Sequence, residues 1–149
     1  MPAILKSMRW LVLDEVLAIE RKVRASARSH VPSSPFSPEI LIIEMMAQTG
    51  ALLLGAESDF KEDLVFAKIE KAAFATHFEK NQTLFIEAHS EALRTEGAWI
   101  EGSVNHEDSE IGRARFLLMN IGHLIPGKEE PVTFHHGFMD HFRIREKIK

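Results

Sequence analysis

Glu44 is the residue in this sequence whose setting most suggests chemistry. It lies inside an almost unbroken apolar run, residues 40–54, that is typical of a helix interior. Burial disfavours a charged carboxylate, so we expect the pKa of Glu44 to be raised. A carboxyl that keeps its proton near neutral pH can act as a general acid. Gln48 lies four residues later on the same helical face and is placed to hydrogen-bond the Glu44 carboxyl.

A general acid needs a base, and His30 is the nearest titratable residue outside the predicted strands. Histidine titrates near neutral pH and can take up a proton that the acid later balances. Two structural alternatives stay open at this point. Glu44 and Gln48 could be a structural pair at a subunit interface or under a loop, and His30 could cap a turn.

The helix that carries Glu44 has clear boundary signals. Ser37 is a good N-cap, and Pro38 at the first helical position gives up only an amide that would be unpaired. We predict a helix from Pro38 to about Leu54, ended by Gly55. Its sequence is apolar on every side, so the helix must be enclosed by protein or lipid. The run falls short of the ~20 residues that cross a bilayer, which favours protein.

Extended segments are predicted on both sides of this helix. The third of the four later segments alternates well, with Ala98, Ile100 and Val104 on one parity. Turns are predicted at "RTEG" and "NHEDSE", and a loop over 31–38. The full set comprises a short helix over 3–10, a hairpin of 12–19 with 21–29, and strands over 64–76, 82–93, 97–105 and 111–119. This order predicts an α+β fold in which about six antiparallel strands wrap around one central helix.

Composition limits the class of protein. A chain of 149 residues fits one domain, 1–149, with residues 121–149 as a C-terminal extension of unassigned structure. The net charge of −4 argues against a nucleic-acid partner. The absence of cysteine excludes disulfides and thiolate metal sites. We therefore predict a soluble, cytoplasmic protein that does not bind membranes.

Two motifs carry a family resemblance. The segment "HVPSSPFSPEILIIEMMAQ" resembles the active-site pattern H-F-P-G-x-P-x-M-P-G-x-L-x-x-E-x-x-A-Q of the hot-dog-fold 3-hydroxyacyl-acyl-carrier-protein dehydratases of fatty-acid synthesis. "FAKIEKAAF", residues 66–74, is similar to that family's F-A-x-I-x-K-A-x-F strand. The residues that fall on the first pattern without a gap are His30, Pro32, Pro35, Pro38, Leu41, Glu44, Ala47 and Gln48.

The resemblance implies a hot-dog homodimer, possibly assembled as a trimer of dimers, whose sites take a histidine from one subunit and a glutamate from the other. It implies dehydration of a 3-hydroxyacyl thioester, bound to acyl carrier protein or coenzyme A, to the trans-2-enoyl thioester. His30 then removes the C2 proton, and Glu44 protonates or orients the leaving 3-hydroxyl. The helix N-terminus at Pro38–Glu39 polarises the thioester carbonyl. No metal or organic cofactor is implied.

Several further residues are candidates for substrate binding, and each has a structural alternative. Phe36 could contact substrate or form a hydrophobic staple at the helix start, and Phe66 could line the site or pack in the core. Ser33 and Glu39 stand where the family has glycine, and a charge on Glu39 would oppose negative charge developing on the substrate. The substrate-binding candidates are Ser33, Phe36, Glu39, Gln48 and Phe66.

The departures at Ser33 and Glu39 keep two other functions open. One is a non-catalytic hot-dog subunit that binds acyl groups, and the other is a hot-dog acyl thioesterase. The strand also lacks the family's usual arginines, so recognition of an acidic carrier would fall to Lys68, Lys71 or the basic end of the chain, residues 143–149. "HHGFMDH", residues 135–141, holds three histidines and Asp140; a surface helix or a lid is favoured there over a metal site.

Overall fold

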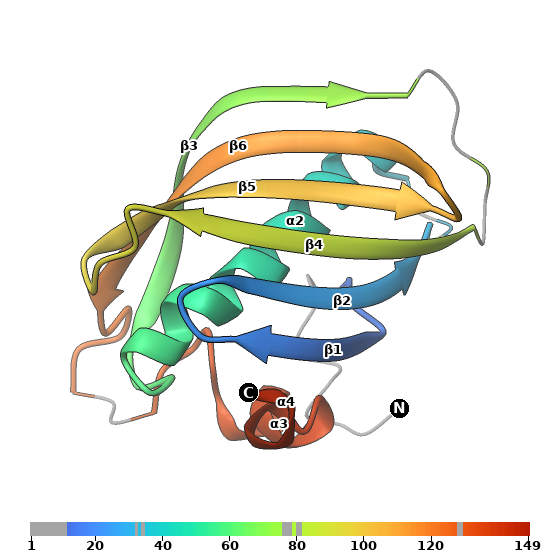
Figure 1. Cartoon of the computed structure of the whole chain (residues 1–149). Helices are drawn as coiled ribbons and strands as arrows, with labels where there is room; N and C mark the ends of the chain where they lie inside the picture. Colours follow the sequence, from blue (N-terminus) through green and yellow to red (C-terminus); the bar gives the residue numbers. More distant parts are fainter. Residues whose placement is uncertain (1–11, 32, 34, 76–78, 80–81, 128–129) are drawn as a thin grey trace.

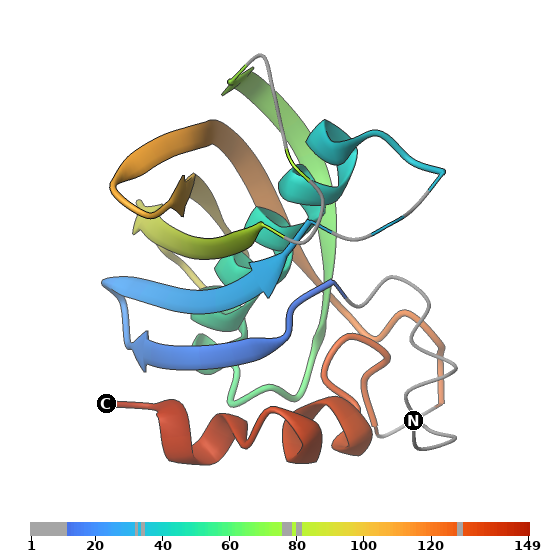
Figure 2. The same cartoon turned by 90° about the vertical axis from the view of Figure 1, so that its right-hand side faces the viewer.

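A strongly curved antiparallel sheet wraps around one long helix (Figures 1 and 2). The computed structural model describes residues 12–149 except 32, 34, 76–78, 80–81 and 128–129. The sheet order is β1-β2-β4-β5-β6-β3, and all neighbours are antiparallel. This confirms the predicted α+β, hot-dog architecture. The elements are β1 (Glu15–Glu20), β2 (Arg24–His30), α2 (Pro38–Glu57), β3 (Asp63–Phe74), β4 (Thr83–Glu91), β5 (Gly97–His106), β6 (Ser109–Gly122), α3 (His136–His141) and α4 (Ile144–Lys147).

The predicted strands and turns agree with this order. β1 and β2 form the expected hairpin, and Ala25 and Ala27 are buried as the alternation requires. In "RKVRASARS", residues 21–29, Val23 shares the parity of Ala25 and Ala27, so the alternation predicts it on the same face. Val23 instead lies in the turn before β2 and is exposed. The predicted helix over 3–10 and Thr76, the end of the predicted strand over 64–76, lie outside the described residues.

The start of α2 was predicted correctly, and its end was not. Ser37 is the N-cap, and its hydroxyl accepts a hydrogen bond from Ile40 N at 3.4 Å. The helix runs two residues beyond Gly55, and the chain turns at Asp59 and Phe60, which both have positive φ. Gly55 is therefore not a helix terminator. A Cβ built there would lie 2.5 Å from Phe134 Cζ, so glycine is needed for close packing.

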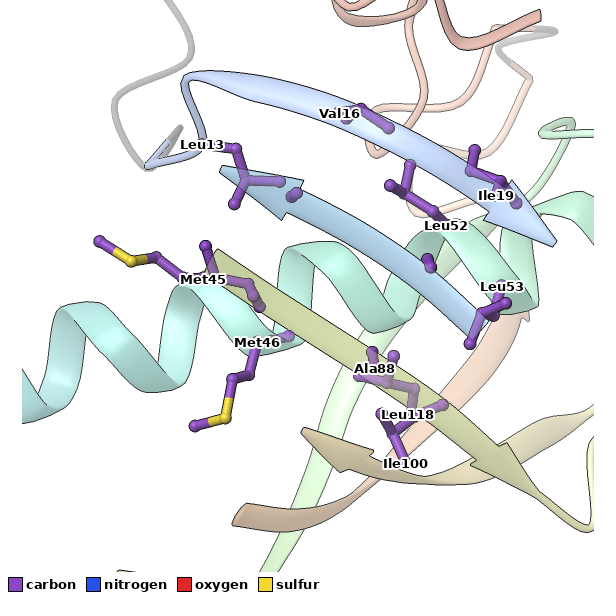
Figure 3. Packing of buried hydrophobic residues seen from close by; sticks show 14 of the residues in the cluster. Leu13, Val16, Ile19, Met45, Met46, Leu52, Leu53, Ala88, Ile100 and Leu118 are labelled. Carbon is purple, nitrogen blue, oxygen red and sulfur yellow. The ribbon is translucent and has the colours of Figure 1, made fainter. Parts of the chain in front are cut away.

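The core lies between α2 and the concave face of the sheet, where buried side chains from both sides interdigitate (Figure 3). In β5 the buried set is Ala98, Ile100, Gly102 and Val104, as the alternation predicted. At 20 residues, α2 is long and apolar enough to span a membrane by length and composition, so the argument that it is too short was wrong. Two thirds of its apolar stretch is buried inside the protein, which is typical of a core helix.

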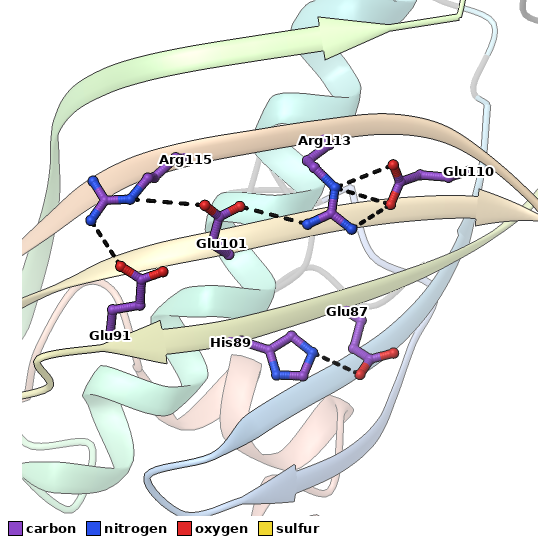
Figure 4. A network of polar contacts seen from close by, with 7 residues as sticks. All are labelled: Glu87, His89, Glu91, Glu101, Glu110, Arg113 and Arg115. Carbon is purple, nitrogen blue, oxygen red and sulfur yellow. Dashed lines mark hydrogen bonds and ion pairs between the residues drawn. The ribbon is translucent and has the colours of Figure 1, made fainter.

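Ion pairs connect neighbouring strands on the outer face of the sheet (Figure 4). Arg115 on β6 pairs with Glu70 on β3 at 2.5 Å and with Glu91 on β4 at 2.8 Å. Its guanidinium also lies 4.3 Å from the centre of the Trp99 ring. One side chain thus connects four strands and supports their register.

The C-terminal segment packs against one end of the core. Phe138, Phe142 and Ile144 are buried, and the Phe134 ring contacts Phe60 at a centroid distance of 5.2 Å. Lys149 N donates a hydrogen bond to Ile19 O on β1 at 2.8 Å. The part of the unassigned segment that follows β6 therefore covers the C-terminal end of α2 and part of the β1 edge. Its helices α3 and α4 lie below the sheet in Figure 2.

We expect Gly55→Ala to destabilise the protein. An added methyl group would clash with Phe134 and Phe60, and overpacking of a core costs about 1–3 kcal/mol. Most of this range exceeds the roughly 1 kcal/mol that alanine gains over glycine in a helix. Urea unfolding measures the difference. In a Phe134→Leu background Gly55→Ala should lower the unfolding free energy by less, because the smaller side chain leaves room for the added methyl group. Equal stability of Gly55→Ala and wild type would contradict this packing.

Candidate functional site

Glu44 lies in an apolar pocket of about 140 Å³ on the side of α2 that faces β3. Its Oε1 accepts a hydrogen bond from Gln48 Nε2 at 3.0 Å, as the i, i+4 spacing predicted. Burial raises the pKa of Glu44, and the bond from Gln48 offsets part of that rise. The carboxyl is thus biased toward its protonated form and held in one orientation. The pocket is lined by Glu44, Ala47, Gln48, Ala51, Leu64, Val65, Phe66, Leu118 and Thr133.

Gln48 also connects this carboxyl to the N-terminal hairpin. Its Oε1 accepts a hydrogen bond from Val12 N at 3.2 Å. The carbonyl of Val12 in turn accepts a bond from the buried hydroxyl of Ser29, the residue before His30. Both ends of the Gln48 amide are therefore engaged, which fixes the side chain that positions Glu44.

His30 ends β2 and pairs with Asp14, a residue that the sequence reasoning missed. His30 Nδ1 lies 2.7 Å from Asp14 Oδ2. A carboxylate only accepts hydrogen bonds, so Nδ1 donates and Nε2 is left as the basic nitrogen. The hairpin register places Glu15 opposite Arg28, which brings Asp14 beside the end of β2. The predicted hairpin lengths alone do not give this pair, because it depends on the observed register and on the bulge between Val16 and Ala18.

The structure brings only some of the predicted site residues together within one chain. Glu44, Gln48 and Phe66 share the pocket, and Phe66 stacks on Phe116 at a centroid distance of 5.1 Å. Phe66 therefore both lines the pocket and packs against the core. Ser33 and Phe36 lie exposed in the loop before α2, and neither they nor His30 line this pocket among the described residues. Pro32 of the motif lies outside the described residues.

The N-terminus of α2 presents a single unused amide among the first-turn residues that the structure describes. Pro38 has no N–H, and the amides of Ile40 and Leu41 both donate to Ser37. The amide of Glu39 is left to face outward at the positive end of the helix dipole. The Glu39 side chain is partly exposed at the same place.

A second group of polar side chains lies away from this pocket. Ligand atoms of Glu130, His135 and His136 lie within 4.8 Å of one another, a spacing that could hold a metal ion. These atoms already form hydrogen bonds at the start of α3. His136 N and Nδ1 contact the Glu130 carboxylate, and His135 Nδ1 accepts from Gly137 N at 3.0 Å. The group therefore caps a helix, in keeping with the surface helix favoured from the sequence.

A curved six-stranded antiparallel sheet around one long central helix defines a hot-dog fold. No protein-family model matches the chain. The 3-hydroxyacyl-acyl-carrier-protein dehydratase FabZ of Caldicellulosiruptor bescii is 29% identical over 128 residues, which span 78% of this chain and 81% of that one. FabZ of a Polaromonas species is 32% identical over 99 residues, 56% of this chain and 68% of that one.

Solved structures agree on the fold. A chain of the dehydratase heterocomplex ApeI:P from Xenorhabdus doucetiae superimposes with a TM-score of 0.64 at 14% identity, covering 76% of this chain and 84% of that one. The sequence relatives show the family as well as the fold. The chain belongs to the FabZ family of 3-hydroxyacyl-acyl-carrier-protein dehydratases.

The raised pKa of Glu44 predicts a pH-dependent contribution to stability. The ordinary value is 4.5, and the folded protein holds the proton more tightly than the unfolded chain does. The stability that this group contributes is therefore full below pH 4.5 and is lost as pH rises through the folded pKa. We expect Glu44→Gln to remove that loss, so that its unfolding free energy relative to wild type increases between pH 4 and pH 8. Urea unfolding at several pH values tests this.

Glu44→Leu serves as the second variant in that series. It differs from Glu44→Gln in packing, which shifts stability by the same amount at every pH. Both variants should share the change with pH relative to wild type. If the unfolding free energy of both variants relative to wild type stayed the same at every pH, a raised pKa of Glu44 would be contradicted.

Proposed function

We propose that this protein dehydrates a 3-hydroxyacyl thioester carried on acyl carrier protein to the trans-2-enoyl thioester. The single observation that carries the proposal is the Glu44 carboxyl, held by Gln48 in an apolar pocket that raises its pKa. Membership of the FabZ family supports the choice of substrate. Composition favours work in the cytoplasm.

The chemistry divides between two side chains. His30 Nε2 removes the proton at C2, and the C2–H electron pair forms the new double bond to C3 as the C3–O bond breaks. Glu44 delivers its proton to the leaving hydroxyl, which departs as water. Afterwards His30 releases a proton and Glu44 regains one, so the site returns to its starting state. A protonated Glu44 is the form this step needs, which the raised pKa favours.

The negative charge that develops on the thioester carbonyl needs a donor in place before the reaction. The Glu39 amide at the start of α2 fits this role, because it is the first-turn N–H left without a partner. The role uses the backbone, so replacing the family's glycine by glutamate keeps the donor. Ser33 and Phe36, in the loop between His30 and α2, would then flank the pantetheine arm.

A complete site requires a second copy of the chain. His30 and the Glu44 pocket are separate within one subunit, and β3 is an edge strand with no partner on its outer side among the described residues. β3 is largely exposed along its length, including Val65, Phe66 and Ile69. Antiparallel pairing of two β3 strands about a two-fold axis would cover these side chains. It would also bring the partner's loop before α2 to the Glu44 pocket.

Two lysines on this strand are candidates for holding the acidic carrier. Lys68 and Lys71 are exposed and form no ion pair with any residue that the structure describes. In the other candidate region, residues 143–149, Arg143 and Arg145 already pair with Glu146 and Asp59, which leaves Lys147 and Lys149 as its lysines. β3 is therefore the better surface for a carrier that must reach the neighbouring pocket.

We expect His30→Ala and Glu44→Gln each to lower the dehydration rate by roughly 10²–10⁴-fold, the usual contribution of a positioned acid or base. The measurement follows the ultraviolet absorbance of the enoyl thioester formed from 3-hydroxyacyl carrier protein. Co-expression of the two variants should restore activity, because a mixed dimer contains one intact site. Random mixing predicts about a quarter of wild-type activity.

Each part of this experiment can fail separately. Wild type that forms no enoyl product from any chain length would contradict the dehydratase function and favour an acyl-binding subunit. Release of free thiol without enoyl product would point to a thioesterase. Impaired single variants with no recovery on co-expression would place His30 and Glu44 of one site in the same subunit.

Asp14 should act as a positioning residue for His30. We expect Asp14→Asn to lower kcat by roughly tenfold or more with little change in KM, because the imidazole loses the group that fixes its tautomer. Glu15→Gln is the matched control, since Glu15 pairs with Arg28 at 2.7 Å and does not contact the imidazole. In a His30→Ala background Asp14→Asn should cause no further loss. An additive loss there would show that Asp14 acts independently of His30.

A further inference from the structure

One end of the Glu44 pocket is lined by the segment after β6. Glu44, Gln48 and Ala51 follow one face of α2, so the pocket extends along the helix for about 10 Å, at 1.5 Å per residue. Leu64, Val65 and Leu118 form the opposite wall. Beyond them the lining residue is Thr133, which belongs to neither the sheet nor α2.

Thr133 lies at the end of the pocket that is remote from Glu44. Its hydroxyl accepts a hydrogen bond from Leu64 N, at the start of β3, at 3.2 Å. The next residue, Phe134, packs against Gly55, one helical turn beyond Ala51. Both contacts place Thr133 at the C-terminal end of α2.

A buried carboxylate fixes this position. Asp63 is 1% exposed, and it accepts hydrogen bonds from Thr133 N and from Leu124 N, each at 2.7 Å. Burial alone would raise the pKa of Asp63, but the bonds from Thr133, Leu124 and Val132 outweigh it and lower the pKa. Asp63 thus clamps the connecting segment at two points. Thr133 is thereby held in place at the end of the pocket remote from Glu44, which we call the floor of the pocket.

We propose that Thr133 is a specificity-determining residue that limits the length of the acyl chain. The proposal rests on the proposed function, in which the thioester reacts beside Glu44 and the rest of the acyl chain extends along α2. The pocket lining between the two ends is mainly alanine, leucine, valine and phenylalanine, which suits an alkyl chain. A cavity of about 150 Å³ accommodates a ligand the size of benzene. The volume of the pocket and its length along α2 therefore fit a short acyl chain, with about six carbons beyond the reacting centre.

Three substitutions of Thr133 separate volume from hydrogen bonding. Thr133→Ser keeps the acceptor for Leu64 N and removes one methyl group, so the optimum should move to longer chains. Thr133→Leu fills the floor and should disfavour long chains. Thr133→Val keeps the volume and loses the hydroxyl, so its length profile should match that of wild type. Val132→Ala is the control, since Val132 is 43% exposed and does not line the pocket.

The measurement is kcat/KM for 3-hydroxyacyl thioesters of four to twelve carbons, with thermal unfolding to establish that each variant is folded. One methylene in an apolar pocket changes discrimination by about tenfold or more. We therefore expect the ratio of eight-carbon to four-carbon kcat/KM to rise severalfold in Thr133→Ser and to fall by about tenfold in Thr133→Leu. Calorimetric binding of saturated acyl-pantetheines of the same lengths gives a second profile that needs no turnover.

The outcomes distinguish this inference from the proposed function. Enoyl product with identical length profiles in Thr133→Ser, Thr133→Leu and wild type would overturn the role of Thr133 and leave the dehydratase intact. No enoyl product, with acyl-pantetheine binding that shifts in length as described, would overturn the dehydratase and support Thr133 as the floor. Binding profiles that do not shift would overturn the floor whether or not the protein is active.

Discussion

The enclosure of one apolar helix by a single sheet is the constraint on which the rest of this structure depends. A helix that is apolar on all sides cannot remain in water, and the sheet must curve to cover it. The close contacts are made where side chains are small. A Cβ on Gly102 would lie 2.9 Å from Met46 Cβ, and one on Gly50 would lie 2.9 Å from Ile100 Cγ2. Glycine at these positions lets sheet and helix approach closely enough to bury the core.

The sheet does not cover α2 completely, and the candidate functional groups lie where it leaves the helix exposed. Ile40, Ile43, Glu44, Gln48 and Ala51 recur at helical spacing and stay partly or fully exposed in one chain. The neighbouring strand β3 is exposed as well. A second copy of the chain that covered this surface would bury apolar area and desolvate Glu44 further, which would raise its pKa more. Assembly and acid catalysis would then have the same physical cause.

The C-terminal segment has a structural and a chemical consequence. Its phenylalanines close the end of the core that the sheet leaves open, and Asp63 ties its start to β3. Because Phe134 seats against Gly55, the preceding residue reaches the pocket. The same packing that completes the core therefore also places Thr133 at the end of the Glu44 pocket.

The sequence by itself determined the elements and the chemical motif, because these depend on local spacing. Ser37 and Pro38 determined where α2 starts, alternation determined the buried face of β5, and the i, i+4 spacing determined the Glu44–Gln48 bond. The sequence could not determine where α2 ends, because Gly55 serves packing with Phe134 rather than a positive φ. It also did not reveal the Asp14–His30 pair, which depends on hairpin register, or the place of Thr133, 82 residues after Ala51 in the chain. Contacts between distant segments follow from how the whole core packs, and only the tertiary structure decided them.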